Sequence, residues 1–247
     1  MLNSVDMPHP RMKFVDYQET YGRHILDAWS QHIPCKAVLD LGCGSGSDLL
    51  AVKRHHPASR CVGIEYSDWA KAQLITKGIE PITVDLEREK LPLPDESMDL
   101  VIGNQILEHT KEIFWINHEV FRVLKVGGFF YLGVPNVLSL HNRLLGLAGI
   151  HPTCVQLCSP HVRAFSKNDT LKLYKKIIPD GIALAKFSGS QFYPFPKSIA
   201  RPLANAMPTL AVSIFFLLQK TALYKGEFMS WLDQAQMETN YFRGGLS

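Results

Sequence analysis

Short apolar runs alternate with longer stretches of mixed polarity along the first half of the chain. Four of these runs end in an acid or an amide: Val38–Asp40, Cys61–Glu65, Ile82–Asp85 and Met98–Asn104. Continuous apolar runs of this length are typical of strands covered on both faces of a sheet. Strands that alternate with helices pair in parallel, so we expect the four polar ends along one edge of the sheet, where such sheets bind ligands.

The stretches between the runs show the 3.6-residue spacing of helices that cover a sheet. A leading helix is predicted over residues 12–33, ended by Pro34. Ser67 is a candidate N-cap for a helix through Lys77 that stops at Gly78. Two more helices are predicted, over Glu112–Lys125 and after the capping box Ser166–Asp169.

Three later apolar runs complete a predicted seven-stranded sheet. They are Gly127–Val134, Ile182–Gly189 and Ala211–Gln219. The intervening segments, residues 137–166 and a loop over residues 192–208, are expected to form a cap. In the tail after Gly226, apolar residues at i, i+3, i+4 and i+7 predict a short helix that docks on the body, acts as a lid or forms a dimer contact.

Composition is consistent with a single domain. The 247 residues are 46% hydrophobic and include five cysteines, and no charged-then-apolar leader occurs at Met1–Arg11. These features predict a reduced, cytoplasmic protein without a disulfide framework. The longest apolar candidate, Leu210–Leu218, is half the length of a membrane span of roughly 18 residues. We expect a core at residues 12–136, with cap segments at 137–165, 192–208 and 226–247.

A glycine loop follows the first predicted strand, with Gly42, Gly44 and Gly46 at every second position. Glycines there allow positive φ and a close approach of the backbone to a ligand, and the next helix offers free N–H groups. Taken alone, the loop could also be a tight turn with no ligand. A nicotinamide-dependent oxidoreductase is disfavoured, because its fingerprint is G-x-G-x-x-G and Asp40 already precedes the first glycine.

Several short sequence motifs within residues 36–190 agree in order and spacing with those of one family. They are the glycine loop, Gly78–Pro81, Gln105–His109, Arg122–Gly128 and Val134–Asn136. With them the chain resembles the class I S-adenosylmethionine-dependent methyltransferases of the ubiquinone and methionine-biosynthesis type. The resemblance implies an α/β, Rossmann-like, mostly parallel sheet with helices on both faces and an antiparallel seventh strand beside the sixth. It implies S-adenosylmethionine as cofactor, bound by Asp40, Gly42, Cys43, Gly44, Ser45, Gly46, Glu65, Tyr66, Asp85, Leu86, Asn104 and Gln105. Tyr17, Tyr21 or Arg23 could also reach its methionine carboxylate.

Methyl transfer to oxygen needs a base with a pKa near neutrality, which favours histidine. The candidates are His109, His141, His151 and His161. We predict His109 and His161 as the catalytic pair, although a lone histidine is more often structural. A catalytically silent cofactor-binding subunit remains the alternative to an enzyme.

A zinc site is the other interpretation of His151, Cys154, Cys158 and His161, which fall within eleven residues. Their spacing is not that of a C-x₂-C clip, and Pro152 and Pro160 interrupt the segment. We therefore predict no resident metal.

The overall charge of +3 conceals an uneven distribution. Residues 137–225 carry eleven Lys or Arg and two acids, whereas residues 1–136 carry fourteen against eighteen. Either the cations form a solvated face or they select an anionic small-molecule acceptor, free or carried on a lipid or sugar. Nucleic acid is disfavoured because no RNA-binding module accompanies the charge; a peripheral membrane contact and a homodimer are both compatible with it. The cations proposed for the acceptor are Arg143, Arg163, Lys197 and Arg201.

Overall fold

The computed structural model describes residues 17–235 and 237–245. One seven-stranded sheet runs through it in the order β3-β2-β1-β4-β5-β7-β6. The first five strands are parallel, and β7 pairs antiparallel with both β5 and β6. This confirms the predicted fold class and the antiparallel seventh strand. The strands are β1 (Ala37–Asp40), β2 (Arg60–Ile64), β3 (Glu80–Ile82), β4 (Met98–Asn104), β5 (Leu124–Pro135), β6 (Ile182–Ser190) and β7 (Ser213–Lys220).

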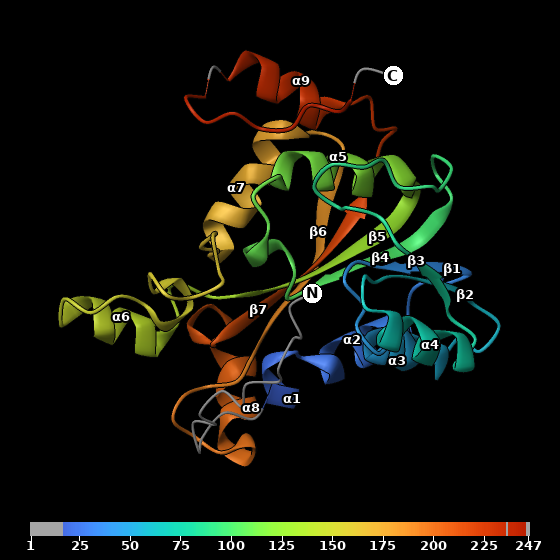
Figure 1. The fold of residues 1–247 in the computed structure, drawn as a ribbon. Helices are drawn as coiled ribbons and strands as arrows, with labels where there is room; N and C mark the ends of the chain where they lie inside the picture. Colours follow the sequence, from blue (N-terminus) through green and yellow to red (C-terminus); the bar gives the residue numbers. More distant parts are fainter. Residues whose placement is uncertain (1–16, 236, 246–247) are drawn as a thin grey trace.

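Helices cover both faces of the sheet (Figure 1). One face packs against α2, α3 and α4, the other against α5, α7 and α9. The described helices are α1 (Tyr17–Thr20), α2 (Arg23–Ser30), α3 (Ser47–Lys53), α4 (Asp68–Thr76), α5 (Ile113–Val123), α6 (Leu140–Leu147), α7 (Lys167–Ile177), α8 (Lys197–Ala206) and α9 (Glu227–Gln234).

Strand β7 illustrates how the sequence builds two cores. Its side chains alternate between faces, as in every strand. Ile214, Phe216 and Leu218 join the core beneath α5, α7 and α9. Phe215 and Leu217 join the core beneath α2, α3 and α4. An uninterrupted apolar run is therefore the pattern that a strand between two helical layers requires.

The predicted capping signals are present in the structure. Ser67 accepts a hydrogen bond from the Ala70 N–H (3.4 Å) at the start of α4. Ser166 accepts one from the Asp169 N–H (3.3 Å) at the start of α7. The predicted tail helix is α9, which buries Phe228 and Leu232 and packs against α5 and α7.

Three predictions need correction. The leading helix is not continuous: it breaks between α1 and α2, where Gly22 has φ 56° and a Cβ atom would overlap the Phe215 ring. Its predicted start at residue 12 lies outside the described residues. The third strand is Glu80–Ile82 rather than Ile82–Asp85; it lies at the sheet edge, where Pro81 is tolerated because no ladder hydrogen bond is lost.

The third correction concerns residues 192–208, which contain helix α8 rather than a loop alone. This helix has Pro202 in its interior and buries only Ala200 and Ala204. Small buried residues and an internal proline hide the helical pattern in the sequence.

The segment between β5 and α7 carries α6, which stands away from the sheet in Figure 1. Among the described residues, we find no helix with the length and apolar character needed to cross a membrane.

Candidate functional site

The glycine loop after β1 adopts the conformations that its glycines allow. Gly42, Gly44 and Gly46 have φ of 66°, 51° and 79°, a region that L side chains rarely enter. A Cβ atom at Gly42 would lie 2.9 Å from Ile106 Cδ1, whereas one at Gly44 would meet nothing within 4 Å. The middle of the loop therefore has open space beside it, while its first glycine packs against the turn after β4.

Cys43 and Ser45 tie the loop to its surroundings. The Cys43 N–H donates to the Ile64 carbonyl (3.0 Å), and its Sγ occupies the space that a Cβ at Gly63 would need. Lys77 Nζ donates to the Ser45 carbonyl (2.6 Å). Burial and, to a lesser extent, Asp40 raise the pKa of the Cys43 thiol, so this cysteine is a packing residue and not a nucleophile.

Two predicted acids lie after the neighbouring strands β2 and β3. Glu65 accepts a hydrogen bond on Oε1 from the Ser67 N–H (2.8 Å), and no described residue donates to its Oε2. Asp85 accepts one from the Glu87 N–H (2.9 Å). Burial, followed by the Asp85 carboxylate, raises the pKa of the exposed Tyr66. Leu86 packs against the core beside them.

Asp40 ends β1 in a buried group of charges. Burial raises the pKa of Asp40 well above its usual range, and Asp48 raises it further while Arg23 opposes the change. Arg23 Nε donates to Asp48 Oδ1 (2.8 Å), and Asn104 Nδ2 donates to Asp48 Oδ2 (2.8 Å). The network joins α2, α3 and the end of β4 around the glycine loop.

The end of β4 carries the signs of a ligand site. Gln105 has φ 57°, which is uncommon for a residue other than glycine. Within the described structure, Gln105 Nε2 and Asn104 Oδ1 are buried and have no hydrogen-bond partner. A buried polar group without a partner costs about 1–3 kcal/mol, and strain of this kind concentrates at functional sites. Together with the open space at Gly44, these polar atoms are consistent with a bound polar cofactor.

The two histidines predicted as catalytic lie against each other. His109 ends the short 3₁₀ turn Leu107–His109, directly after β4. Its ring meets that of His161 edge to face, with 4.7 Å between the centroids. The backbone N–H of Val162 donates to the Glu108 carbonyl (2.8 Å), which holds the two segments together.

Glu108 lies beneath this pair and was not predicted as a site residue. Its side chain is 1% exposed, and its Oε1 lies 3.9 Å from His109 Nε2. Neither carboxylate oxygen has a hydrogen-bond partner among the described residues. Burial raises the pKa of Glu108 to about 8, because the charged form loses water without gaining a donor.

Protonation of the histidines is set by their neighbours. Burial and then the nearby His161 lower the pKa of His109, although its ring also donates to the Pro160 carbonyl. His161 Nδ1 lies 2.9 Å from the Cys154 carbonyl; because a carbonyl only accepts, Nδ1 carries the proton. A neutral His161 therefore has Nε2 as its basic nitrogen, and a neutral His109 keeps one nitrogen available as a base.

The zinc candidates do not come together as a set. His161 meets the backbone of Cys154, the Cys154 thiol accepts from Asn142 Nδ2 (3.6 Å), and Cys158 is exposed. In the described part of the chain, the group able to share a cation is Glu108, His109 and His161, whose donor atoms lie within 4.8 Å of one another.

The four cations proposed for the acceptor have different surroundings. Arg201 donates twice to Glu19 (2.8 and 2.7 Å), and Lys197 lies 3.1 Å from the same carboxylate. Glu19 is buried, so its single carboxylate offsets one of these two charges, while both cations still reach solvent; their role toward the acceptor stays a prediction. Arg143 donates to the Leu138 carbonyl (2.7 Å).

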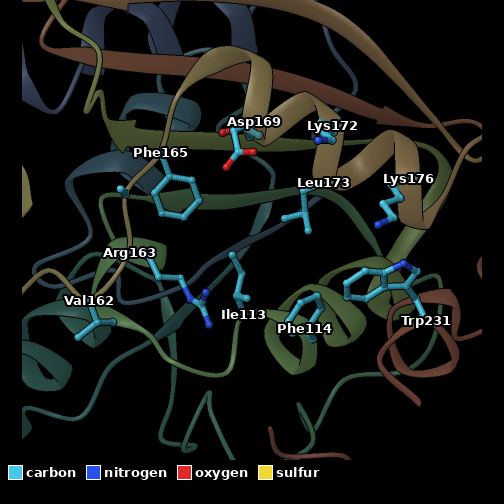
Figure 2. Close-up of a pocket in the computed structure, with 12 residues that line it drawn as sticks. Ile113, Phe114, Val162, Arg163, Phe165, Asp169, Lys172, Leu173, Lys176 and Trp231 are labelled. Carbon is cyan, nitrogen blue, oxygen red and sulfur yellow. The ribbon is translucent and has the colours of Figure 1, made fainter. Parts of the chain in front are cut away.

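Arg163 lies at a cavity of about 410 Å³ between α5, α7 and α9. Its guanidinium donates to the carbonyls of Thr110 and Lys111. Figure 2 shows Leu173, Lys172 and Lys176 on α7, with Ile113 and Phe114 across the cavity. Phe114 stacks on Trp231 at 5.2 Å. Apolar walls with three cations and one acid, Asp169, suit an anionic compound that has an apolar part.

Comparison with known proteins agrees with this arrangement. Residues 39–132 match the family model described as a methyltransferase domain. The chain is 36% identical over 107 residues to a probable S-adenosylmethionine-dependent methyltransferase of Mycolicibacterium smegmatis. The matched region covers 41% of this chain and 39% of that relative. It thus spans about two fifths of the length of that relative.

Solved structures share the fold over most of the chain. The plantazolicin methyltransferase BpumL in complex with SAH superimposes with a TM-score of 0.56 at 15% identity, covering 83% of this chain and 86% of that one. The [4+2]-cyclase SpnF gives a TM-score of 0.56 at 18% identity, covering 81% of each chain. The matched sequence, the sheet order and the glycine loop together identify residues 39–132 as a methyltransferase domain, similar to those of S-adenosylmethionine-dependent enzymes, within the class I methyltransferase fold.

Proposed function

We propose that the protein transfers the methyl group of S-adenosylmethionine to an oxygen or nitrogen atom of a small metabolite. The observation that carries the proposal is the contact between His109 and His161, directly after β4. This pair lies next to the strand end where Asn104 and Gln105 have buried polar atoms without partners in the described structure. The pair would supply a neutral base beside the end of β4, where we expect the methyl group of the cofactor.

The cofactor contacts follow from the same edge of the sheet. Glu65 has a carboxylate oxygen available for the ribose hydroxyls, and we assign Asp40 and the backbone of residues 42–46 to the methionine part. Tyr66, Asp85 and Leu86 are assigned to the adenine. Asn104 and Gln105 hold the reacting end of the cofactor and exclude water from it, and such alignment is worth about 7–11 kcal/mol.

When bound, S-adenosylmethionine supplies an electrophilic methyl group, and the electron pair of its breaking C–S bond stays on sulfur. His109 takes the proton from the acceptor's O–H or N–H on the nitrogen that does not donate to Pro160. The acceptor atom keeps its electron pair and forms the new bond to carbon. His161 packs against the His109 ring and fixes its orientation.

For the acceptor, we infer an anionic or carrier-linked metabolite. The support is the cavity in Figure 2, where Arg163, Lys172 and Lys176 surround apolar side chains. Val162 also lines this cavity and directly follows His161, so the cavity adjoins the histidine pair through the chain. Because Lys197 and Arg201 share the carboxylate of Glu19 as an ion-pair partner, the cavity is the better place for the anionic group.

A second function of a different class is a cofactor-binding protein that does not transfer methyl groups. The structural similarity to the [4+2]-cyclase SpnF supports this alternative, because the name of that protein describes a reaction other than methyl transfer on the same fold.

Calorimetric titration separates these functions. We expect wild-type protein to bind S-adenosylmethionine and not NADH. Glu65→Ala should weaken binding roughly tenfold to a hundredfold, because charge-assisted hydrogen bonds to the ribose are lost. Glu80→Ala is the matched control, since this acid pairs with Arg60 at the start of β3 and β2, the opposite end of these strands from Glu65. Binding of NADH alone would refute the proposal, and binding without transfer to any acceptor in a metabolite panel would favour the second function.

A further inference from the structure

Helix α6 exposes apolar side chains and buries a polar one, which is the reverse of the usual arrangement in a surface helix. Leu140, Leu144 and Leu147 occur at i, i+4 and i+7, so they form one stripe. They are 36%, 60% and 86% exposed, whereas the polar Asn142 is 2% exposed. An amphipathic helix of a globular protein normally turns such a stripe to the core.

The orientation of α6 is fixed by hydrogen bonds of the buried amide. Asn142 Nδ2 donates to the Asn136 carbonyl (3.0 Å). Its Oδ1 accepts from the Thr153 N–H (3.0 Å) and from the Thr153 hydroxyl (3.2 Å). Rotating the leucines inward would break these bonds and leave buried polar groups unpaired, which is costly. The exposed stripe is therefore a built feature of the segment.

The apolar surface extends beyond the helix. Of the 17 large hydrophobic residues that are exposed among the described residues, seven fall between residues 138 and 162. Figure 1 shows α6 projecting away from the sheet and from the other helices. Contiguous apolar surface on a monomer marks a contact site. The seven are Leu138, Leu140, Leu144, Leu147, Ile150, Leu157 and Val162.

Along the sequence, the charges in this segment and next to it are of one sign up to Asp169, which lines the cavity together with Val162. No Asp or Glu occurs between Glu119 and Asp169, whereas Arg143, Arg163 and Lys167 do occur there. Arg143 is exposed and directly precedes Leu144. Exposed leucines beside cations, without acids, are the features of a helix that lies in the interface of a membrane with anionic lipids.

We propose that residues 138–162, led by the leucine stripe of α6, dock the protein on an anionic lipid bilayer. A bilayer fits the surface better than a protein partner does. Leucine is under-represented among the residues that dominate protein interfaces, where Trp and Tyr prevail, and the seven exposed residues include no aromatic side chain. The proposal does not rest on methyl transfer: Val162 also lines the proposed acceptor cavity, whereas Leu144 and Leu147 on α6 do not.

Vesicle flotation tests the proposal. Wild-type protein is mixed with vesicles of phosphatidylcholine alone, or of equal parts phosphatidylcholine and phosphatidylglycerol, at low and high salt. We expect binding to the mixed vesicles that weakens with salt. The double variant Leu144→Ser with Leu147→Ser should bind the mixed vesicles with an affinity lower by roughly tenfold or more, because two apolar side chains no longer enter the lipid.

Ile75→Ser is the matched control. Ile75 is 64% exposed on α4, outside the α6 segment, so vesicle binding should not change. Circular dichroism melting checks that each variant is folded. Equal vesicle binding by wild type and the double variant would overturn the proposal. A second result would also overturn it: no variant binds vesicles, wild type and Ile75→Ser form a dimer, and the double variant is a monomer. That result would assign the surface to a second copy of the chain.

Discussion

At the scale of single residues, the site consists of groups that the sequence displays and of one that it conceals. The glycines, the acids at strand ends and both histidines could be named from the sequence because their spacing after apolar runs is regular. Glu108 could not be named from the sequence, because what marks it as a site residue is its burial without a hydrogen-bond partner among the described residues. The one signal was an acid between the apolar Leu107 and a histidine. The ligand contacts of these residues stay predictions.

His109→Gln should lower kcat by roughly 10²-fold or more, because glutamine cannot accept the acceptor's proton. Affinity for S-adenosylmethionine should change little. In wild type, kcat/KM should rise with pH with its midpoint below pH 6.5, since burial lowers the pKa of His109 from its usual value of 6.5. Steady-state kinetics across pH provide the measurement. The exposed His32 gives the control His32→Gln, and an unchanged rate in His109→Gln would exclude the base.

Glu108→Gln should stabilise the protein at neutral and mildly alkaline pH. Below pH 4.5 the carboxyl is protonated in both states; between 4.5 and about 8 the unfolded chain loses the proton while the folded chain keeps it. Ionisation therefore favours unfolding in this window, by about 1.4 kcal/mol per pH unit. Urea unfolding with a chelator present should show the variant's advantage growing from about pH 5 to about pH 8. A pH-independent difference would contradict this.

At the scale of elements, the N-terminal segment is joined to the cap by Glu19, which the sequence could not show because Arg201 lies far along the chain. Burial alone would raise the pKa of Glu19, but hydrogen bonds from Arg201 and Lys197 outweigh it and lower the pKa. The sequence also predicted the long helices and caps but missed α8, since Ala200 and Ala204 are too small to mark a buried face.

Glu19→Gln should lower the free energy of unfolding by about 1–2 kcal/mol at neutral pH, because two cations lose their partner yet still reach solvent. The pKa of Glu19 is lowered in the folded state, so this contribution exists above pH 4.5 and is lost as the pH falls. Urea unfolding measures it. Glu80→Gln, at an exposed ion pair with Arg60, should cost less; an equal loss in both variants would mean that the buried position of Glu19 has no special effect.

At the scale of the whole molecule, the order of elements and the apolar runs predicted the sheet, because parallel strands between two helical layers leave few alternatives. The uneven charge was visible as well, but not its distribution in space: Glu19, from the acidic half of the chain, pairs with Arg201 and Lys197, whereas Lys172 and Lys176 lie at the cavity.

Lys172→Ala should raise KM for an anionic acceptor several-fold at low salt and leave a neutral analogue unaffected, because a single partly screened charge is lost. Lys175→Ala is the control, since that lysine lies on the same helix but does not line the cavity. Initial rates at two ionic strengths give the comparison. Identical KM values for both analogues in wild type and Lys172→Ala would mean that the cavity does not select for charge.

The position of β7 between β5 and β6 also governs the order in which the protein can be completed during synthesis. Strand β6 leaves the ribosome before β7, yet it pairs with β7 alone. Until Lys220 has emerged, β5 presents an open apolar edge and β6 has no partner in the sheet. Open edges of this kind invite aggregation of nascent chains. The sheet is therefore complete only after β7 has been synthesised, which makes the emergence of this strand the step at which a chaperone would be needed most.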